Sequence, residues 1–227
     1  MPEFSLEKAL VLSAKRLGER SWILSLFSRE QGRILGVYQK KQPPETGVFV
    51  TGRWRARLAE QLGNLYLEES NPFVVRYLDD YRRLACISSL CALLDDFLPE
   101  RQSFADLYDS VCHFFEQFDE DTFLKNYVLL ERDLLSDIGF GLDTSSCAGG
   151  GDARDLAYIS PKTGRAVSRE KGKPYHNKLL ILPKFLWTDS GATNEDIQNG
   201  LILIGYFLTQ HSPKHRLPIT RQSLLPR

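Results

Sequence analysis

The sequence predicts an α+β protein in which an N-terminal five-stranded β-barrel precedes an α-helical domain with an inserted hairpin. Short alternating segments with turn residues between them fill the first 70 residues, and from about residue 77 apolar residues recur at the helical spacing of three or four. A glycine run at 149–151 then interrupts the helical pattern. We expect the barrel at 1–78 and the helical domain at 79–227, with the hairpin at about 143–177.

The barrel is predicted from five strand-like segments and the turn signals between them. Turns are marked by Gly18, Gly32 and Gly63, and a loop with two prolines separates the third and fourth segments. Five short strands in this length favour a Greek-key barrel of the oligonucleotide-binding type, although an SH3-like barrel would give a similar pattern. The expected strands are residues 9–14, 22–27, 33–38, 48–58 and 62–68.

The helical domain is predicted from four segments with an apolar stripe. Ser103 is of the type that caps a helix N-terminus, and Thr193 with Asp196 resembles a capping box. Between the third and fourth helices, two strand-like segments at 156–159 and 165–167 predict a hairpin. The expected helices are residues 77–94, 103–118, 121–138 and about 194–210.

The charges are segregated along the chain, although 29 basic and 29 acidic residues give a net charge of zero. Residues 1–78 carry a net +4, residues 79–137 a net −9 and residues 138–227 a net +5. Two cationic regions separated by an anionic one indicate a polyanionic partner or a charged protein partner.

The cysteines and the apolar runs indicate the compartment. Four widely spaced cysteines do not match a disulfide framework, so a reducing cytosol is the simplest compartment. The start of the chain lacks the pattern of a signal peptide, and the longest apolar run, Leu201–Leu208, is far below the roughly 20 residues of a membrane-spanning helix. We expect a cytoplasmic protein with no membrane partner.

The common enzyme signatures are absent from the sequence. There is no G-x-x-x-x-G-K-[ST], G-x-G-x-x-G, G-x-S-x-G or H-E-x-x-H motif. The carboxylate pairs at 79–80 and 95–96 fit solvated helix ends better than magnesium ligands. His211 and His215 have the spacing of a helical metal pair, but Pro213 disrupts the helix that such a pair needs. We therefore predict no catalytic residue, no metal and no cofactor.

Basic residues interleaved with aromatic ones are concentrated in the barrel. Residues 15–57 hold ten basic and three acidic side chains, a net of +7. The alternation from Arg53 to Arg57 places three arginines on one face of a strand, where they would follow successive phosphates of a nucleic acid. Trp22 and Tyr38 are candidates for base stacking, although the core is the better expectation for either ring. The candidate DNA-binding residues of the barrel are Lys15, Arg16, Arg33, Lys40, Lys41, Arg53, Arg55 and Arg57.

A second basic stretch surrounds the predicted hairpin. Residues 154–184 hold eight basic residues against Asp155 and Glu170. This stretch fits a second DNA-binding surface or an ordinary solvated loop equally well. The candidate DNA-binding residues here are Arg165, Lys171 and Lys173.

Several short motifs follow one another in a recognisable order. The barrel contributes 9–14, Gly18-Glu19 and 26–33; the helical part contributes Glu131, Leu134-Leu135, 139–143 and 147–151; the hairpin contributes 158–167. In this order they resemble the RecO family of bacterial recombination mediators along nearly the whole chain, and the last motif is similar to the hairpin of alphaproteobacterial members.

The resemblance implies an oligonucleotide-binding barrel, a helical domain and a non-enzymatic role. RecO proteins bind single- and double-stranded DNA, anneal complementary strands, and work with RecR and the single-stranded DNA-binding protein to load RecA. The implied partners are thus DNA, RecR and the acidic C-terminal tail of the single-stranded DNA-binding protein, and the implied location is the cytoplasm, at the nucleoid during repair.

Some RecO proteins hold zinc through four cysteines in the hairpin segment. Only Cys147 lies in that region of this chain, so the hairpin is expected to be zinc-finger-like without the metal ligands. Cys147 also has no basic or histidine neighbour in sequence to lower its pKa, and we expect a buried or loop thiol.

Two other function classes compete with a DNA-annealing mediator. One is a metal-dependent nuclease that uses the acidic helical domain, and strand cleavage with magnesium would identify it. The other is a protein-interaction scaffold whose acidic body binds a basic partner without DNA, and a failure to bind oligonucleotides at low salt would favour it.

Overall fold

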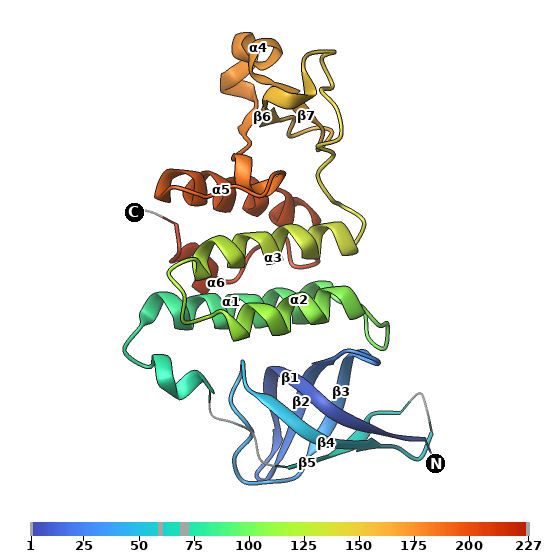
Figure 1. Cartoon of the computed structure of the whole chain (residues 1–227). Coiled ribbons are helices and arrows are strands. Elements are labelled where there is room, and N and C mark those ends of the chain that lie inside the picture. Colours follow the sequence, from blue (N-terminus) through green and yellow to red (C-terminus); the bar gives the residue numbers. More distant parts are fainter. Residues whose placement is uncertain (1, 59–60, 69–72, 226–227) are drawn as a thin grey trace. The chain divides into compact units, whose positions relative to one another are not determined.

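The structure is a computed structural model of the chain, and it describes residues 2–58, 61–68 and 73–225 (Figure 1). The fold is α+β, with two compact units. The first unit holds the chain up to Asp109 together with Pro218–Leu224, and the second holds Ser110–Leu217. The boundary lies inside helix α2 (Ala105–Glu116).

The first unit contains a closed barrel of five strands, all of which the sequence predicts. The strands neighbour one another in the order β1-β2-β3-β5-β4, and β4 closes the ring by pairing with β1. Only the pairing of β3 with β5 is parallel among these. The strands are β1 (Glu3–Gly18), β2 (Ser21–Ser28), β3 (Gly32–Tyr38), β4 (Phe49–Arg55) and β5 (Gly63–Leu67).

Trp54 is the largest side chain of the barrel core. It is 1% exposed, its Nε1 donates a hydrogen bond to the Leu35 carbonyl at 2.9 Å, and its ring stacks on Phe4 with centroids 4.9 Å apart. A Cβ at Gly63 would lie 2.3 Å from the Trp54 ring. The start of β5 therefore requires glycine in order to pass beside the tryptophan.

Helix α1 (Tyr81–Phe97) packs against β1 within the first unit. It begins later than the expected residue 77 because the preceding residues form a 3₁₀ helix, η1 (Phe73–Tyr77). The Asp80 side chain caps α1 by accepting a hydrogen bond from the Arg83 amide at 3.0 Å. A short helix, α6 (Ile219–Gln222), also packs against α1.

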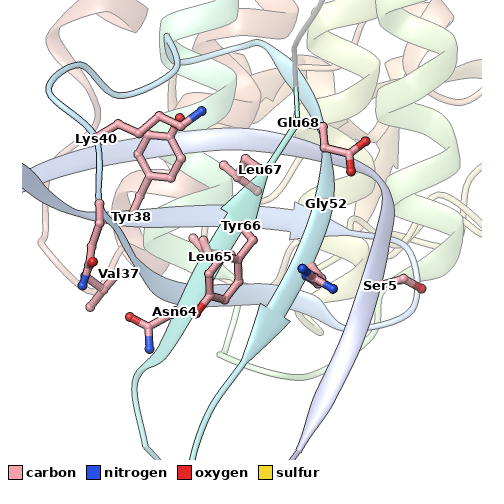
Figure 2. A pocket seen from close by; sticks show the side chains of 12 residues that line it. Ser5, Val37, Tyr38, Lys40, Gly52, Asn64, Leu65, Tyr66, Leu67 and Glu68 are labelled. Carbon is pink, nitrogen blue, oxygen red and sulfur yellow. The ribbon is translucent and has the colours of Figure 1, made fainter.

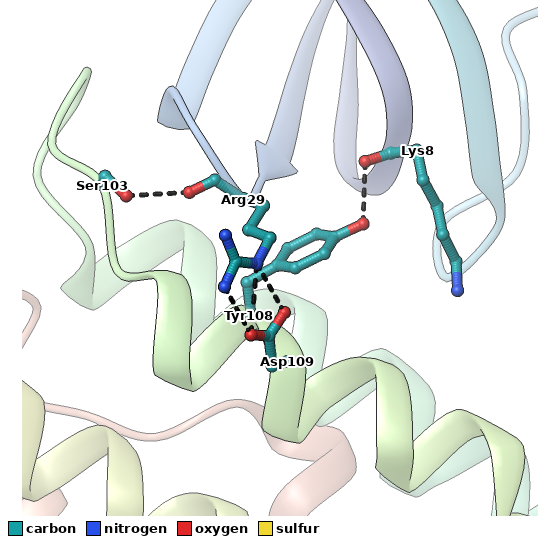
Figure 3. Close-up of polar contacts among 5 residues, drawn as sticks. All are labelled: Lys8, Arg29, Ser103, Tyr108 and Asp109. Carbon is teal, nitrogen blue, oxygen red and sulfur yellow. Dashed lines mark hydrogen bonds and ion pairs between the residues drawn. The ribbon is translucent and has the colours of Figure 1, made fainter.

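The first turn of α2 is joined to the barrel by polar contacts (Figure 3). The Arg29 guanidinium donates two hydrogen bonds from Nε and Nη2 to the Asp109 carboxylate, at 2.8 and 2.9 Å. The Tyr108 hydroxyl donates to the Lys8 carbonyl at 2.7 Å. The Ser103 hydroxyl, expected to cap the helix, donates instead to the Arg29 carbonyl at 2.8 Å. These bonds align the start of α2 with the β2–β3 turn.

The second unit combines helices with a small antiparallel sheet. Helix α3 (Phe123–Asp137) packs against α5 (Asn194–His211), and the predicted capping box is confirmed at Thr193 and Asp196. The sheet has the order β7-β6-β8. Its strands are β6 (Leu156–Ile159), β7 (Ala166–Ser168) and β8 (Leu180–Ile181), and the short helices beside it are η2 (Ala153–Asp155), α4 (Arg169–Gly172), η3 (Lys173–Lys178) and η4 (Lys184–Leu186).

The helices bear on two predictions, that His211 and His215 do not form a helical metal pair and that the chain has no membrane-spanning helix. Helix α5 ends at His211, ahead of Pro213, so His211 and His215 do not share a helix. Across the described ranges, every helix is too short or too polar to cross a bilayer.

Candidate nucleic-acid interface

Two arginines of β4 point outward from the barrel, as the alternation predicts. The side chains of Arg53 and Arg55 are 64% and 47% exposed, whereas Trp54 between them is buried. Arg57 is exposed too, but β4 ends at Arg55 and Arg57 lies in the following connection. The regular strand geometry thus fixes two of the three arginines on one face.

One carboxylate lies beside both of these arginines. Glu3 is opposite Arg55 in the β1–β4 pairing, and its two oxygens lie 3.8 Å from Arg53 Nη1 and Arg55 Nε. The three side chains are all 42% exposed or more. Ion pairs this long and this exposed are weak and screened by salt, so a phosphate can displace Glu3.

Tyr66 presents an exposed ring next to Arg53. The two residues are paired across β4 and β5, and the Arg53 guanidinium lies 5.5 Å from the ring centroid. Tyr66 is 51% exposed. Tyr66 is not among the predicted site residues, although it alternates in phase with the polar Asn64 and Glu68 and out of phase with the two buried leucines of β5.

A pocket of about 580 Å³ opens between the end of β3, β4 and β5 (Figure 2). It forms because β3 pairs with β5 only as far as Tyr38, after which the chain turns away into the loop that carries Lys40. Lys40 Nζ lies 5.6 Å from the Tyr38 ring centroid. The pocket therefore brings two predicted basic residues, Lys40 and Arg53, together with the rings of Tyr38 and Tyr66.

A third basic residue adjoins this group through strand pairing. Arg16 is opposite Trp22 in β1–β2, and Trp22 is opposite Tyr38 in β2–β3, so the three side chains share one face of the sheet. The Arg16 guanidinium lies 5.8 Å from the Trp22 ring centroid. Trp22 is half-buried and Tyr38 is 8% exposed, so both rings belong mainly to the core, as expected.

Arg33 does not join the exposed basic residues. Its Nε donates to the Leu98 carbonyl at 2.7 Å, Nη1 lies 3.6 Å from Asp95, and its side chain is 17% exposed. Asp95 also accepts a hydrogen bond from the Ser13 hydroxyl at 2.9 Å, so it is not the solvated helix-end residue that the sequence indicated. We therefore leave Arg33 out of the interface.

The two remaining barrel candidates are exposed lysines. Lys15 directly precedes Arg16 on β1, so its side chain points to the opposite face of the strand. Lys41 follows Lys40 in the loop after β3. Both are exposed, and neither lines the pocket.

Four of the eight basic residues of the hairpin segment lie beside carboxylates. Two of the partners, Asp143 and Asp152, precede the stretch in which the sequence shows its excess of basic residues. Among residues that the structure describes, Lys173 has no carboxylate within 4.0 Å. The ion pairs are Arg154 with Asp152 (3.1 Å), Arg165 with Asp143 (3.3 Å), Arg169 with Asp155 (3.4 Å) and Lys171 with Glu170 (3.6 Å).

The Cys147 thiol is buried, as predicted, but its pKa is lowered although no basic or histidine residue is near it in sequence. Burial raises the pKa of Cys147, but hydrogen bonds from Ser168 and from the backbone amides of Gly151 and Gly149 outweigh it and bring the pKa to about 7. The Ser168 amide donates to Sγ at 3.1 Å. The donors are backbone groups of a glycine turn and of β7, which a search for basic neighbours cannot reveal.

Comparisons with known proteins point to a single family. A family described as "Recombination protein O C terminal" matches residues 78–219. The DNA repair protein RecO of Rhodospirillum centenum is 42% identical over 213 residues, which cover 90% of this chain and 85% of that protein. RecO of Caulobacter vibrioides is 38% identical over 240 residues, which cover 100% and 96%. The chain belongs to the RecO family.

Membership of the RecO family decides between enzyme and mediator. RecO proteins are recombination mediators of DNA repair and not enzymes, so the nuclease alternative is set aside. Within the described residues no three histidine, cysteine or acidic side chains gather as a metal site. The zinc of some RecO proteins does not fit the hairpin here, because Cys147 is the one cysteine of this segment where a four-cysteine site needs four.

Proposed function

We propose that this RecO-family protein binds single- and double-stranded DNA without sequence preference, anneals complementary strands, and helps to load RecA onto DNA covered by the single-stranded DNA-binding protein. The observation that carries the proposal is the barrel pocket, where Lys40 and Arg53 lie beside the rings of Tyr38 and Tyr66. Basic grooves with aromatic platforms are typical of proteins that bind single strands.

The barrel, at about residues 1–78, is the proposed DNA-binding domain and is of the oligonucleotide-binding type. Five strands, closure of β4 onto β1 and the parallel β3–β5 pairing support this assignment over an SH3-like barrel. The hairpin is the zinc-finger-like insertion, without the metal ligands. The proposed DNA contacts are Lys15, Arg16, Lys40, Lys41, Arg53, Arg55 and Arg57 in the barrel, with Arg165, Lys171 and Lys173 as weaker contacts in the hairpin.

Annealing on such a surface requires charge neutralisation and no covalent chemistry. Two strands repel each other through their phosphates, and basic residues that displace counterions lower this repulsion. The exposed guanidinium groups of Arg53 and Arg55 are suited to this role because their competing carboxylate, Glu3, is held at 3.8 Å and is exposed. Affinity and annealing rate should both fall steeply as salt rises.

The protein partners are RecR and the acidic tail of the single-stranded DNA-binding protein. A pocket of about 580 Å³ in the second unit supports the tail contact. Apolar side chains, Leu129, Phe185 and Trp187, line it together with two cations, Lys125 and Arg132, and two carboxylates, Asp133 and Asp189. Arg132 Nη2 lies 2.7 Å from Asp133 Oδ1. An acidic peptide with an apolar side chain can contact the apolar lining and displace Asp133 from Arg132.

The tail contact can be tested with a labelled peptide of the tail sequence. Replacing Arg132 by alanine should weaken peptide binding because the pocket loses a guanidinium. Arg154→Ala, which removes an exposed arginine at the hairpin, is the matched control and should leave the peptide affinity unchanged. Equal affinities for all three proteins would remove this pocket from the proposal.

The DNA function is tested with two measurements on the whole chain. Fluorescence anisotropy of a labelled single strand reports binding at several salt concentrations, and addition of the complement reports annealing. Binding that weakens steeply with salt, together with annealing faster than in the absence of protein, is the expected result. If no binding occurs at low salt, the DNA function is wrong and a scaffold that binds only proteins is favoured.

A further inference from the structure

We propose that the barrel pocket is a seat for one unpaired nucleobase, which stacks on the Tyr66 ring while its phosphate lies on Arg53. The inference rests on the proposed function, because it takes the barrel as the DNA surface. It adds what that function leaves open: the protein distinguishes single strands from duplex at this seat. In this arrangement Tyr66 distinguishes single strands from duplex, and Arg53 binds the phosphate.

The ring of Tyr66 is placed as a stacking platform. It lies on β5, where Tyr66 pairs with Arg53 of β4 and the preceding residue, Leu65, pairs with Tyr38 of β3, so the backbone beneath the ring is held by the barrel. The ring is about half exposed, and the Arg53 guanidinium at 5.5 Å restricts how it can turn. A base that stacks here gains contact with the ring and places its own backbone near Arg53.

The polar lining of the pocket fits a base edge better than a phosphate. Asn64 and Gln39 each offer an amide that both donates and accepts hydrogen bonds, and Glu68 offers a carboxylate. A carboxylate repels a phosphate but accepts hydrogen bonds from the exocyclic amino group of a base. Figure 2 shows Asn64 on β5, the strand of Tyr66, and Glu68 just beyond the end of that strand.

The floor of the pocket is left open by a glycine. Gly52 lines the pocket with a φ of +152°, and a Cβ at this position would lie 2.2 Å from the Tyr66 carbonyl oxygen. Any side chain there would push β4 away from β5, on which Tyr66 stands. The close pairing of the two strands and the empty floor therefore depend on the same residue.

Only an unpaired base can use such a seat. In a duplex each base is stacked and hydrogen-bonded to its complement, and taking it out costs a few kcal/mol. A single strand held at Tyr66 therefore loses this contact when its complement pairs with the seated base. Duplex is then held by phosphate contacts alone, which promotes release of the annealed product.

The inference is tested by anisotropy with a labelled mixed-sequence oligonucleotide, presented as a single strand and as a duplex. Tyr66→Leu should weaken single-strand binding about tenfold and leave duplex binding unchanged, because stacking on one aromatic ring is lost. Tyr66→Phe should retain wild-type affinity for both. Tyr175→Leu, which removes an exposed tyrosine of the second unit, is the matched control and should change neither.

A strand with abasic sites keeps the phosphates and removes the bases. The wild-type protein should bind the abasic strand with the affinity that Tyr66→Leu shows for the intact strand, and the variant should lose nothing further on the abasic strand. If Tyr66→Leu binds the intact single strand as tightly as wild type while Arg53→Ala does not, the seat is wrong and the proposed function stands. A wild-type chain that binds no DNA would overturn both.

Discussion

The barrel and the hairpin segment are both rich in basic residues, but they hold them in different ways. In the barrel, Arg16, Lys40 and Arg53 lie over aromatic rings at 5.8, 5.6 and 5.5 Å. In the hairpin segment, four of the basic side chains have a carboxylate within 3.6 Å. Among the described residues, Arg16 and Lys40 have no carboxylate within 4.0 Å, and Glu3 approaches Arg53 only to 3.8 Å. The carboxylates of the hairpin lie closer to their cations, so the barrel presents more charge to DNA.

The comparison shows that a count of charges along the chain does not measure the charge available to a ligand. The hairpin stretch is less cationic than its sequence indicates because Asp143 and Asp152 reach it from outside. Two arginines of the barrel stretch are also less available to a ligand, because they bind carboxylates in the folded protein. Arg29 is bound by Asp109, which lies 80 residues away, and Arg33 by Asp95.

The largest effect is expected from removing the exposed arginines of β4. The double substitution Arg53→Ala and Arg55→Ala should lower affinity for single strands about tenfold at low salt, because two phosphate contacts are lost. Duplex affinity should fall as well, since phosphates are common to both. Anisotropy titration measures this effect, and an affinity within a factor of two of wild type would place the DNA elsewhere.

A gain of affinity is expected from removing the carboxylate that competes with DNA. Glu3→Gln keeps the shape of the side chain but frees Arg53 and Arg55 from the contact at 3.8 Å. Affinity should rise about threefold at low salt, in keeping with the modest strength of exposed ion pairs. Glu7→Gln, on the same strand, is the matched control. A loss of affinity on Glu3→Gln would mean that Glu3 positions the arginines instead of competing with DNA.

A smaller effect is expected from the hairpin. Replacing Arg165, Lys171 and Lys173 together by alanine should lower DNA affinity less than about twofold, because two of the three cations are already paired with carboxylates. Filter binding or anisotropy suffices to measure it. A loss as large as that of the β4 variant would show that DNA displaces Asp143 and Glu170, and would make the hairpin an equal part of the interface.

The smallest change in DNA binding is expected for Arg33→Ala, whose effect should appear in stability. The substitution removes the hydrogen bond to the Leu98 carbonyl and the ion pair with the half-buried Asp95, which keeps the hydrogen bond from the Ser13 hydroxyl. A loss of roughly 2 kcal/mol is expected for a hydrogen-bonded charge of this kind. Thermal unfolding should then shift down by roughly 4–8 °C, whereas Lys41→Ala, at an exposed site, should melt as wild type does.

Much of the fold was predictable because its signals are local. The alternation in the five barrel strands and the Thr193–Asp196 capping box are patterns of adjacent residues, and the structure confirms them. β8 and α6 were not predicted, since two and four residues are too few to show a period. The hydrogen-bond donors to Asp95 and Cys147 come from segments that are distant in sequence, so no local pattern predicts these contacts.

The candidate interface was predictable to the extent that it depends on strand alternation. Arg53 and Arg55 follow from the period of two, and Tyr66 would have followed from the same rule applied to β5. The pocket itself was not predictable. It depends on where β3 stops pairing with β5, and therefore on a contact between strands that are separated by a loop and by β4.

The central claim, that DNA is held by the β4 side of the barrel, is tested most directly by the salt dependence of single-strand binding. The slope of log affinity against log salt should be compared for wild type, the Arg53→Ala/Arg55→Ala variant and the hairpin triple variant. We expect a slope flatter by about 1.4 for the β4 variant, at about 0.7 per phosphate contact, and a smaller change of slope for the hairpin variant. An unchanged slope for the β4 variant with a flatter slope for the hairpin variant would contradict the claim.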